Sequence, residues 1–352
     1  MALLTTTIGA YPKPGYVKLP DWFNNPEGPD TSNPTESWHK AIEALGPDAK
    51  DIISRGVNEA VADQVDAGID IPTDGEIPRE NYIHYHCRHL NGIDFGRLTE
   101  KELRNGAYSA FLPTISGAIS VRDYFLANDW KVAQAATDKP VKITMPGPMT
   151  ISDTTVDIFY DDPKKLGADL AEALNAEVLA LAEAGCRHIQ IDEPLFARKV
   201  DEALDYGMEN LERAFHNCPA HVTRTVHMCC GYPDRLDNPD YPKAPKGSYL
   251  QLADAVDASS IMAVSIEDAH RHNDLALLER YRNTSIILGV VAIAKSAVES
   301  VDEIAERLKA ALNHIDAERL IAAPDCGLGL LGRELAVKKL ENMCAAAKTV
   351  PT

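Results

Sequence analysis

The chain of 352 residues is long enough for two average domains or one large α/β barrel. It carries 35 basic and 53 acidic side chains, and a net charge of −18 argues against a nucleic-acid-binding face. No apolar run approaches the ~20 residues that span a bilayer, and the first residues lack the basic and apolar segments of a signal peptide. We therefore expect a cytoplasmic protein with no nucleic-acid or membrane partner.

Eight short segments rich in β-branched residues alternate with longer amphipathic stretches. The predicted strands are residues 5–8, 69–73, 141–145, 187–191, 221–226, 261–265, 286–290 and 320–323. The predicted helices include residues 36–67, 163–184, 301–313 and 333–347. This alternation is typical of a parallel sheet covered by helices. Eight strands of this kind predict a closed (β/α)8 TIM barrel.

We expect one catalytic domain over residues 1–352, with a helical insertion at residues 97–139, where the polarity is mixed. Residues 12–35 are rich in Pro, Asn, Gly and Asp, and residues 231–247 contain four prolines, so both segments are predicted to be long loops. Loops of this length in a compact enzyme are usually functional. No glycine-rich phosphate-binding motif follows the first strand, which argues against a nucleotide cofactor.

The seven cysteines are an odd number and are spread thinly along the chain, which argues against a disulfide framework. Two of them, Cys229 and Cys326, directly follow predicted strands. Cys230 should face away from Cys229 and pack in the core. The other four, Cys87, Cys186, Cys218 and Cys344, lie within helical or strand patterns and are expected to be structural.

The strongest candidate site lies at the carboxyl ends of the strands, where barrel enzymes place their chemistry. His227 and Cys229 follow the fifth predicted strand, Glu267 follows the sixth and Cys326 follows the eighth. Side chains i and i+2 of a strand point to the same side, so His227 and Cys229 can reach one ion. Thiolate, imidazole and carboxylate are ligands of zinc. We therefore predict a zinc ion held by these four residues.

The predicted ligand set indicates thiol chemistry. A thiolate rather than a thiol is the nucleophile, and coordination to zinc deprotonates a thiol. Two cysteinate ligands keep such a site rich in electrons. Glu267 would be the weakest of the four ligands, so an incoming sulfur could displace it.

Carboxylates form a second group near the predicted pocket. Asp192 and Glu76 are interpreted as functional, either binding a substrate ammonium group or handling protons. For their neighbours Glu193 and Asp74, a helix cap or a buried ion pair is an equally good interpretation. Arg79 is expected either to pair with these carboxylates or to hold a substrate anion.

These motifs, in this order, resemble the cobalamin-independent methionine synthase family. The matching stretches are residues 6–12, 74–76, 147–150, 189–194, 227–229, 265–267 and 324–328. The resemblance spans nearly the whole chain, but only the C-terminal, catalytic half of the long two-barrel enzymes. It implies zinc on the four ligands named above, with Glu76 and Asp192 lining the pocket for homocysteine.

The chain also departs from the family pattern. Serine is usual in the family at the position of Ala10, and Tyr-Asp-Ile-His-Ser is usual where residues 291–295 read Val-Ala-Ile-Ala-Lys. The family's Asp and His, implicated in substrate binding and proton supply, are therefore Ala292 and Ala294 in this chain. Loss of polar contacts weakens a pocket built for an amino acid. Lys295 is a candidate for holding an anionic thiol such as a sulfonate.

The sequence thus leaves three functions open. The leading one is zinc-dependent methylation of homocysteine, with a folate or a methylcorrinoid as possible methyl donor. The alternative is alkyl transfer to a different thiol, because epoxyalkane:coenzyme M transferases look similar at this length. The third is a non-catalytic protein that binds zinc or a corrinoid partner. The oligomeric state is not predicted.

Overall fold

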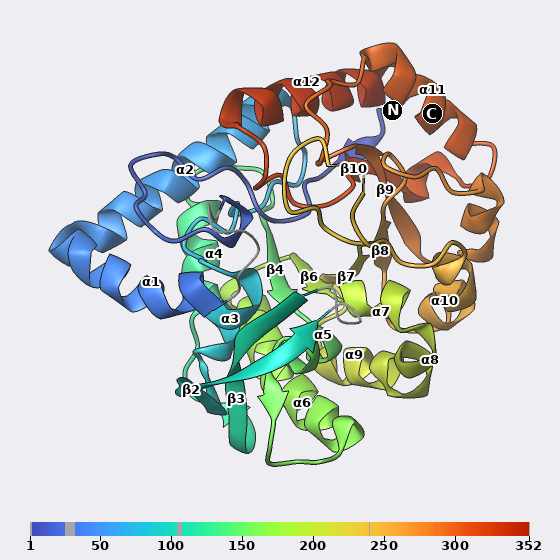
Figure 1. Cartoon of the computed structure of the whole chain (residues 1–352). Coiled ribbons are helices and arrows are strands. Elements are labelled where there is room, and N and C mark those ends of the chain that lie inside the picture. Colours follow the sequence, from blue (N-terminus) through green and yellow to red (C-terminus); the bar gives the residue numbers. More distant parts are fainter. Residues whose placement is uncertain (1, 25–31, 104–107, 239, 352) are drawn as a thin grey trace.

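The computed structural model describes residues 2–24, 32–103, 108–238 and 240–351 (Figure 1). Seven parallel strands form one curved sheet in the order β1-β10-β9-β8-β7-β6-β4. Their bounds are β1 Leu4–Thr5, β4 Lys142–Pro146, β6 His188–Asp192, β7 Thr223–Met228, β8 Ala263–Ile266, β9 Ser285–Val291 and β10 Leu320–Pro324.

The sheet closes between its two edge strands, β1 and β4, through residues 71–73. Ile71 pairs with Thr6, and Thr73 pairs with Lys142, both in parallel. The Lys142 N–H also donates to the Pro72 carbonyl at 2.8 Å. The predicted (β/α)8 barrel is confirmed, with the second predicted strand reduced to these isolated bridges.

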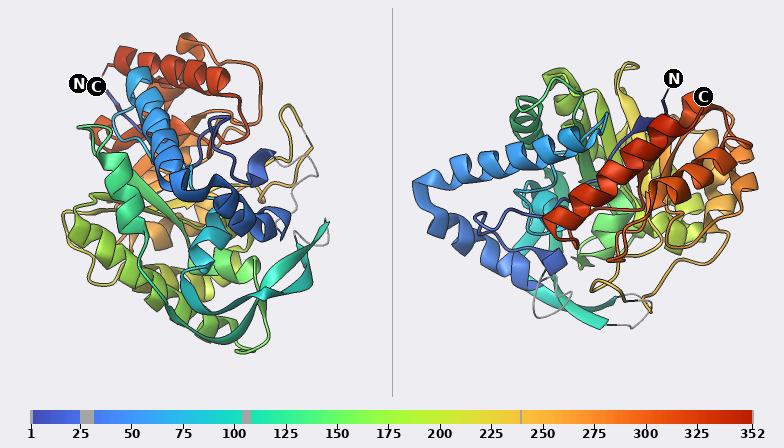
Figure 2. Two further views of the ribbon diagram at one scale, coloured as in Figure 1. Left: turned by 90° about the vertical axis from the view of Figure 1, so that its left-hand side faces the viewer. Right: turned by 90° about the horizontal axis from the view of Figure 1, so that it is seen from above.

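Helices cover the outside of this sheet (Figures 1 and 2). Their bounds are α1 Ser32–Leu45, α2 Ala49–Ala67, α3 Tyr82–Cys87, α4 Leu126–Gln134, α5 Pro148–Asp153, α6 Pro163–Ala184, α7 Pro194–Arg198, α8 Val200–Glu202, α9 Met208–Ala214, α10 Ser248–Asp257, α11 Val301–Ala311 and α12 Arg333–Thr349. The two chain ends lie side by side, and the Leu3 N–H donates to the Ala347 carbonyl at 3.3 Å. In the described part of the chain, no helix is long and apolar enough to cross a membrane.

Local sequence explains where the longest helix begins and ends. Asp162 caps the first turn of α6 by accepting from the N–H groups of Lys164 and Lys165, and Pro163 occupies the first helical position. Gly185 ends the helix with a left-handed φ of 108°, which glycine adopts without steric cost. These signals fix α6 at the bounds predicted from the sequence.

The predicted helical insertion is wrong over most of its length. Strands β2 Leu90–Leu103 and β3 Tyr108–Val121 form an antiparallel hairpin, and the short strand β5 Val156–Asp157 pairs with β3. Only α4 is helical, while residues 104–107 lie outside the described residues. Most side chains of β2 are partly or fully exposed, so the strand shows no alternation of apolar and polar residues. Hydrogen bonding to β3, rather than burial, holds β2 in place.

Side chains inside and outside the barrel differ in character. Ile143, Met145 and Ile189 belong to the main core, which lies between the sheet and the helices. A separate small cluster consists of Ile8, Ala263, Ile287 and Ala323. Because side chains alternate along a strand, this second cluster lies on the other face of the sheet, in the barrel interior. It lies below the carboxyl ends of the strands, where the polar residues gather.

Candidate metal centre and active site

Three predicted ligands meet at the carboxyl end of the barrel. His227 is in β7, Cys229 directly follows β7, and Cys326 lies two residues after the end of β10. One donor atom from each lies within 4.8 Å of the others. The Cys326 Sγ is 3.4 Å from the His227 Nε2. Two thiols and an imidazole at this spacing are a donor set that suits zinc.

A neighbouring hydroxyl fixes the orientation of the imidazole. The His227 Nδ1 lies 2.9 Å from the Ser265 Oγ in β8, the strand paired with β7. This contact leaves Nε2 directed at Cys326. A histidine that ligates a metal usually has its second ring nitrogen held in this way.

Contact between the two cysteines shifts their pKa values in opposite directions. A hydrogen bond from Cys326 lowers the pKa of the Cys229 thiol, although burial opposes this effect. The same bond raises the pKa of Cys326, and burial adds to that rise. Cys229 therefore becomes a thiolate more readily than an ordinary cysteine, which suits a metal ligand.

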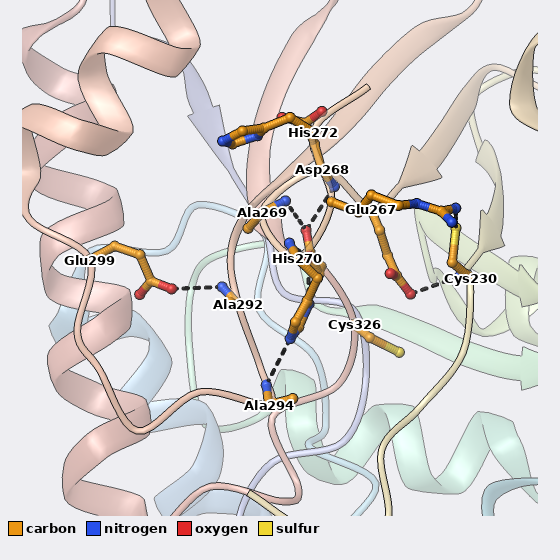
Figure 3. A network of polar contacts seen from close by, with 12 residues as sticks. Cys230, Glu267, Asp268, Ala269, His270, His272, Ala292, Ala294, Glu299 and Cys326 are labelled. Atoms are coloured by element: carbon orange, nitrogen blue, oxygen red, sulfur yellow. Dashed lines mark hydrogen bonds and ion pairs between the residues drawn. The ribbon is translucent and has the colours of Figure 1, made fainter. Parts of the chain in front are cut away.

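Glu267, the fourth predicted ligand, is not part of this group. Its carboxylate accepts a hydrogen bond from the Cys230 N–H at 2.7 Å and lies within 4.8 Å of groups on His270 and Asp325 (Figure 3). Burial raises the pKa of Glu267. The structure thus brings three of the four predicted ligands together and places the fourth beside the residue that follows Cys229. Its role as a ligand stays a prediction.

Asp325, the residue before Cys326, is held by hydrogen bonds from the segment that follows β8. The buried Asp325 carboxylate accepts from the N–H groups of Asp268, Ala269 and His270. The His270 Nδ1 lies 2.6 Å from the same carboxylate, while its Nε2 accepts from the Ala294 N–H at 3.1 Å. This network joins the segments that follow β8, β9 and β10, and sequence reasoning missed His270 because it lies beyond the strand-end motif.

A small cavity of about 60 Å³ adjoins the three clustered ligands. Ala10, Glu76 and Asp192 line it, and their role in binding a substrate stays a prediction. Asp192 accepts a hydrogen bond from the Gln190 Nε2 at 2.7 Å, and burial raises its pKa to about 7. The cavity therefore contains two carboxylates within a largely apolar surface.

Glu76 is held in an unusual backbone conformation. Its φ of 55° is left-handed, a region that residues other than glycine rarely adopt. Its carboxylate accepts from the Thr144 hydroxyl at 2.7 Å and pairs with Arg79 at 3.3 Å. A Cβ on Gly9 would lie 2.6 Å from the Glu76 Oε1, so a larger residue at position 9 would displace this carboxylate. Burial raises the pKa of Glu76, against the effect of Arg79.

Two predicted substrate-binding cations lie outside this cavity. Arg79 is buried and pairs with Asp74 at 3.1 Å as well as with Glu76, so it serves as the ion-pair partner that the sequence offered as one interpretation. Lys295 is exposed and lines a separate cavity of about 540 Å³ beside α11. The two alanines of that segment, Ala292 and Ala294, are buried and do not line the small cavity.

Glu193 has a structural role. Its carboxylate accepts from the N–H groups of Met149 and Thr150 in the first turn of α5 and from the Thr150 hydroxyl. Burial nevertheless raises the pKa of Glu193 to about 8. This arrangement holds the Gly147-Pro148 turn against the end of β6, where the Gly147 N–H donates to the Asp192 carbonyl at 2.9 Å.

An aromatic cluster covers the small cavity, and sequence reasoning did not single out its members. Trp22 and Phe23 come from the predicted loop at residues 12–35, and their ring centroids are 4.6 Å apart. Phe23 also contacts Tyr232 at 5.0 Å, and Tyr82 of α3 lies 6.0 Å from Trp22. The length of the loops at residues 12–35 and 231–247 was the available signal. It predicted that these loops are functional but did not indicate which of their residues are involved.

Comparison with known proteins identifies the family. Residues 3–349 match the family described as the catalytic domain of the cobalamin-independent synthase. The chain belongs to the cobalamin-independent methionine synthase family. A methionine synthase of Saccharolobus solfataricus is 30% identical over 353 residues, covering 99% of this chain and 95% of that protein. A methionine synthase of Sulfolobus acidocaldarius is 26% identical and covers 97% and 90% of the two chains.

Solved structures agree with this assignment. A B12-independent methionine synthase from Shewanella sp. W3-18-1, in complex with selenomethionine, matches with a TM-score of 0.85 and 29% identity over 99% of this chain and 97% of that chain. A vitamin-B12-independent methionine synthase described as putative, from Listeria monocytogenes, has a TM-score of 0.70 at 19% identity, covering 98% of each chain. This second match supports the fold alone. The family predicted from the motifs is confirmed.

Proposed function

We propose that this member of the family is a zinc-dependent S-methyltransferase that methylates homocysteine. One observation carries the proposal: His227, Cys229 and Cys326 line the same cavity as Glu76 and Asp192. A metal-bound sulfur and a substrate ammonium group can therefore be held by one small pocket. The selenomethionine bound to the Shewanella protein supports a pocket for a sulfur amino acid or its selenium analogue.

The ligands of the proposed zinc ion are His227, Cys229 and Cys326, with Glu267 as the fourth. When bound, zinc supplies a Lewis acid that keeps a substrate thiol deprotonated near neutral pH. Ser265 orients the imidazole of His227 through its contact with Nδ1. Glu76 and Asp192 bind the ammonium group, and the aromatic cover formed by Trp22 and Phe23 excludes water from the sulfur.

The partners of the enzyme are a small-molecule thiol and a methyl donor, for which a folate and a methylcorrinoid are the two candidates. The position of Lys295 weakens the coenzyme M alternative, because that side chain lies outside the cavity that contains the metal ligands. We also infer one catalytic domain over residues 1–352 and a cytoplasmic location.

The substitution Asp192→Asn tests the amino-acid pocket. It should weaken L-homocysteine binding to the zinc-loaded protein by about tenfold or more, because a charge-assisted hydrogen bond is lost. Binding of 2-mercaptoethanol, which has a thiol but no ammonium group, should not change. Calorimetric titration measures both, and equal losses for the two thiols would exclude the assigned role of Asp192.

A panel of thiols separates the three candidate functions. Methionine formed from L-homocysteine and a methyl donor supports the proposal. Turnover of other thiols alone supports alkyl transfer to a different acceptor. Zinc-bound thiol without turnover, with both candidate donors supplied, supports a non-catalytic binding protein.

A further inference from the structure

A second cavity, of about 620 Å³, lies on the same face of the barrel. Its walls include Leu195 and Arg198 of α7, which begins two residues after Asp192, and residues 242–245, which follow β7. The Ala244 N–H donates to the carbonyl of Cys230, the residue next to Cys229, at 2.7 Å. The larger cavity is therefore built from the segments that directly follow the strands of the proposed active site.

Four basic side chains line this cavity, although the chain as a whole has a net charge of −18: Lys101, Arg198, Lys199 and Lys243. Two of them are already engaged. The Lys101 Nζ donates to the carbonyls of Ser152, Asp153 and Thr155, at 2.9 to 3.2 Å. Lys199 pairs with the Asp153 carboxylate at 3.2 Å.

Neither of the other two cations forms a hydrogen bond or an ion pair with an acidic side chain within the described residues. Arg198 makes no hydrogen bond or ion pair there, and its Nε is buried without an acceptor. The Lys243 Nζ lies 4.6 Å from the centre of the Tyr241 ring, and the charges of Glu267 and Asp325 act on it without forming an ion pair. A buried guanidinium donor without an acceptor is costly, so a ligand oxygen is the missing partner that this cavity can accept.

Acidic residues on the cavity wall do not neutralise these two cations. Asp153 pairs with Lys199, and Glu202 accepts from the Tyr206 hydroxyl at 3.2 Å. Glu102 is exposed at the end of β2. A planar guanidinium and a nearby ammonium group suit a phosphate or a carboxylate, which accept several hydrogen bonds at once.

Arg198 also lies within electrostatic range of the small cavity. Tyr82 lines that cavity, and burial raises its pKa while the positive charge of Arg198 opposes the rise. The two cavities are neighbours, because Pro194 lines the smaller one and the next residue, Leu195, lines the larger one. Their volumes are about 60 Å³ and 620 Å³. The smaller one suits the thiol substrate, which leaves the larger one for a bulkier reactant.

We propose that Arg198 and Lys243 bind an anionic group, a phosphate or a carboxylate, of the methyl donor. This inference rests on the proposed function. The bound anion anchors the donor so that its methyl group reaches the sulfur in the small cavity. During transfer the thiolate electron pair forms the new S–CH3 bond, while the old bond to the methyl group breaks and its electrons stay with the donor.

The test measures anion binding to the zinc-loaded protein with two probes, inorganic pyrophosphate and glutarate. Arg198→Gln should weaken binding of the preferred probe by about tenfold, because a charged fork of donors is lost. Lys243→Gln should give a smaller loss. Lys309→Gln removes the same charge from an exposed position on α11 and should leave the affinity unchanged.

The preferred probe identifies the donor chemistry: pyrophosphate indicates a phosphate group and glutarate a carboxylate. Failure of both probes to bind in the millimolar range, or equal affinity in Arg198→Gln and wild type, overturns the proposal. A separate titration of the same variants with L-homocysteine distinguishes failure of the anion site from failure of the proposed function. Homocysteine that does not bind the wild-type protein refutes the proposed function, whereas normal homocysteine binding without anion binding refutes the anion site alone.

Discussion

At the scale of single residues, the spacing of His227 and Cys229 was the feature that best predicted the metal ligands. Side chains two apart at a strand end point the same way, and the structure brings both beside Cys326. The sequence did not give the orientation of Glu267, because its carboxylate is directed by the Cys230 N–H, a partner that strand order alone does not reveal.

Other residues of the site were beyond sequence reasoning for a related reason. Trp22 and Phe23 lie in a loop with no periodic pattern, so only the fold shows that they cover the pocket. Arg79 and Lys295 are both basic and close to motifs, yet one is buried among carboxylates and the other is exposed. Side-chain direction decided these cases, and it depends on packing between distant segments.

The substitution Ser265→Ala tests the orientation of the metal ligand. Removing the hydroxyl that holds the His227 Nδ1 should weaken zinc affinity by about tenfold to a hundredfold, as expected for a residue that supports a ligand. Cys326→Ser, which removes a ligand itself, should lose most of the zinc and all turnover. Competition with a zinc-binding dye measures the zinc affinity of both variants, and an activity assay measures turnover.

The matched control is Ser116→Ala, at an exposed position of the β2–β3 hairpin. Its zinc affinity should equal that of the wild type. Full zinc occupancy and activity in Cys326→Ser would refute the ligand set.

At the scale of elements, predictions succeeded where apolar residues marked a buried face and failed where they did not. Helix α6 has Asp162, Pro163 and Gly185 at its ends and a continuous buried face. Strand β2 is paired but most of its residues are half-buried or exposed, and its sequence carries no period of two. The structure therefore reveals β2 through its pairing with β3, which the sequence pattern does not indicate.

Glu177 of α6 provides a test of how α4 is held. Its carboxylate accepts from the Phe125 N–H at the start of α4, and burial raises its pKa from 4.5 to about 7. The folded state thus keeps a proton that the unfolded state releases between these values. Stability from this group is complete below pH 4.5 and is lost as the pH rises through about 7.

Glu177→Gln should remove this dependence. The free energy of unfolding of the wild type, relative to the variant, should fall by about 3 kcal/mol between pH 4.5 and pH 8. Urea unfolding at several pH values measures the difference. Parallel pH profiles for the two proteins would show that Glu177 titrates normally.

At the scale of the whole molecule, the barrel was the most predictable feature because eight strands and their order leave few other arrangements. Closure depends on residues 71–73, which join β1 to β4 by isolated bridges. The proposed metal ties the end of β7 to the end of β10, two strands that are not neighbours in the sheet. Binding energy at this site therefore contributes to the stability of the entire barrel.

Removal of zinc with a chelator should lower the melting temperature by about 5–10 °C, since a ligand that binds only the folded state stabilises it. Calorimetry of the chelated and zinc-loaded protein measures the shift. Adding zinc back should restore the original value, whereas magnesium should not. An unchanged melting temperature after verified loss of zinc would show that zinc binding does not stabilise the fold.

Calorimetric titration of the zinc-loaded protein with L-homocysteine and, separately, with 2-mercaptoethanesulfonate tests the proposed function most directly. The pocket formed by Glu76 and Asp192 beside the metal ligands predicts that homocysteine binds at least about tenfold more tightly. Tight binding of the sulfonate thiol with little response to homocysteine would contradict the proposed methylation of homocysteine, because it would assign this barrel to a different alkyl transfer.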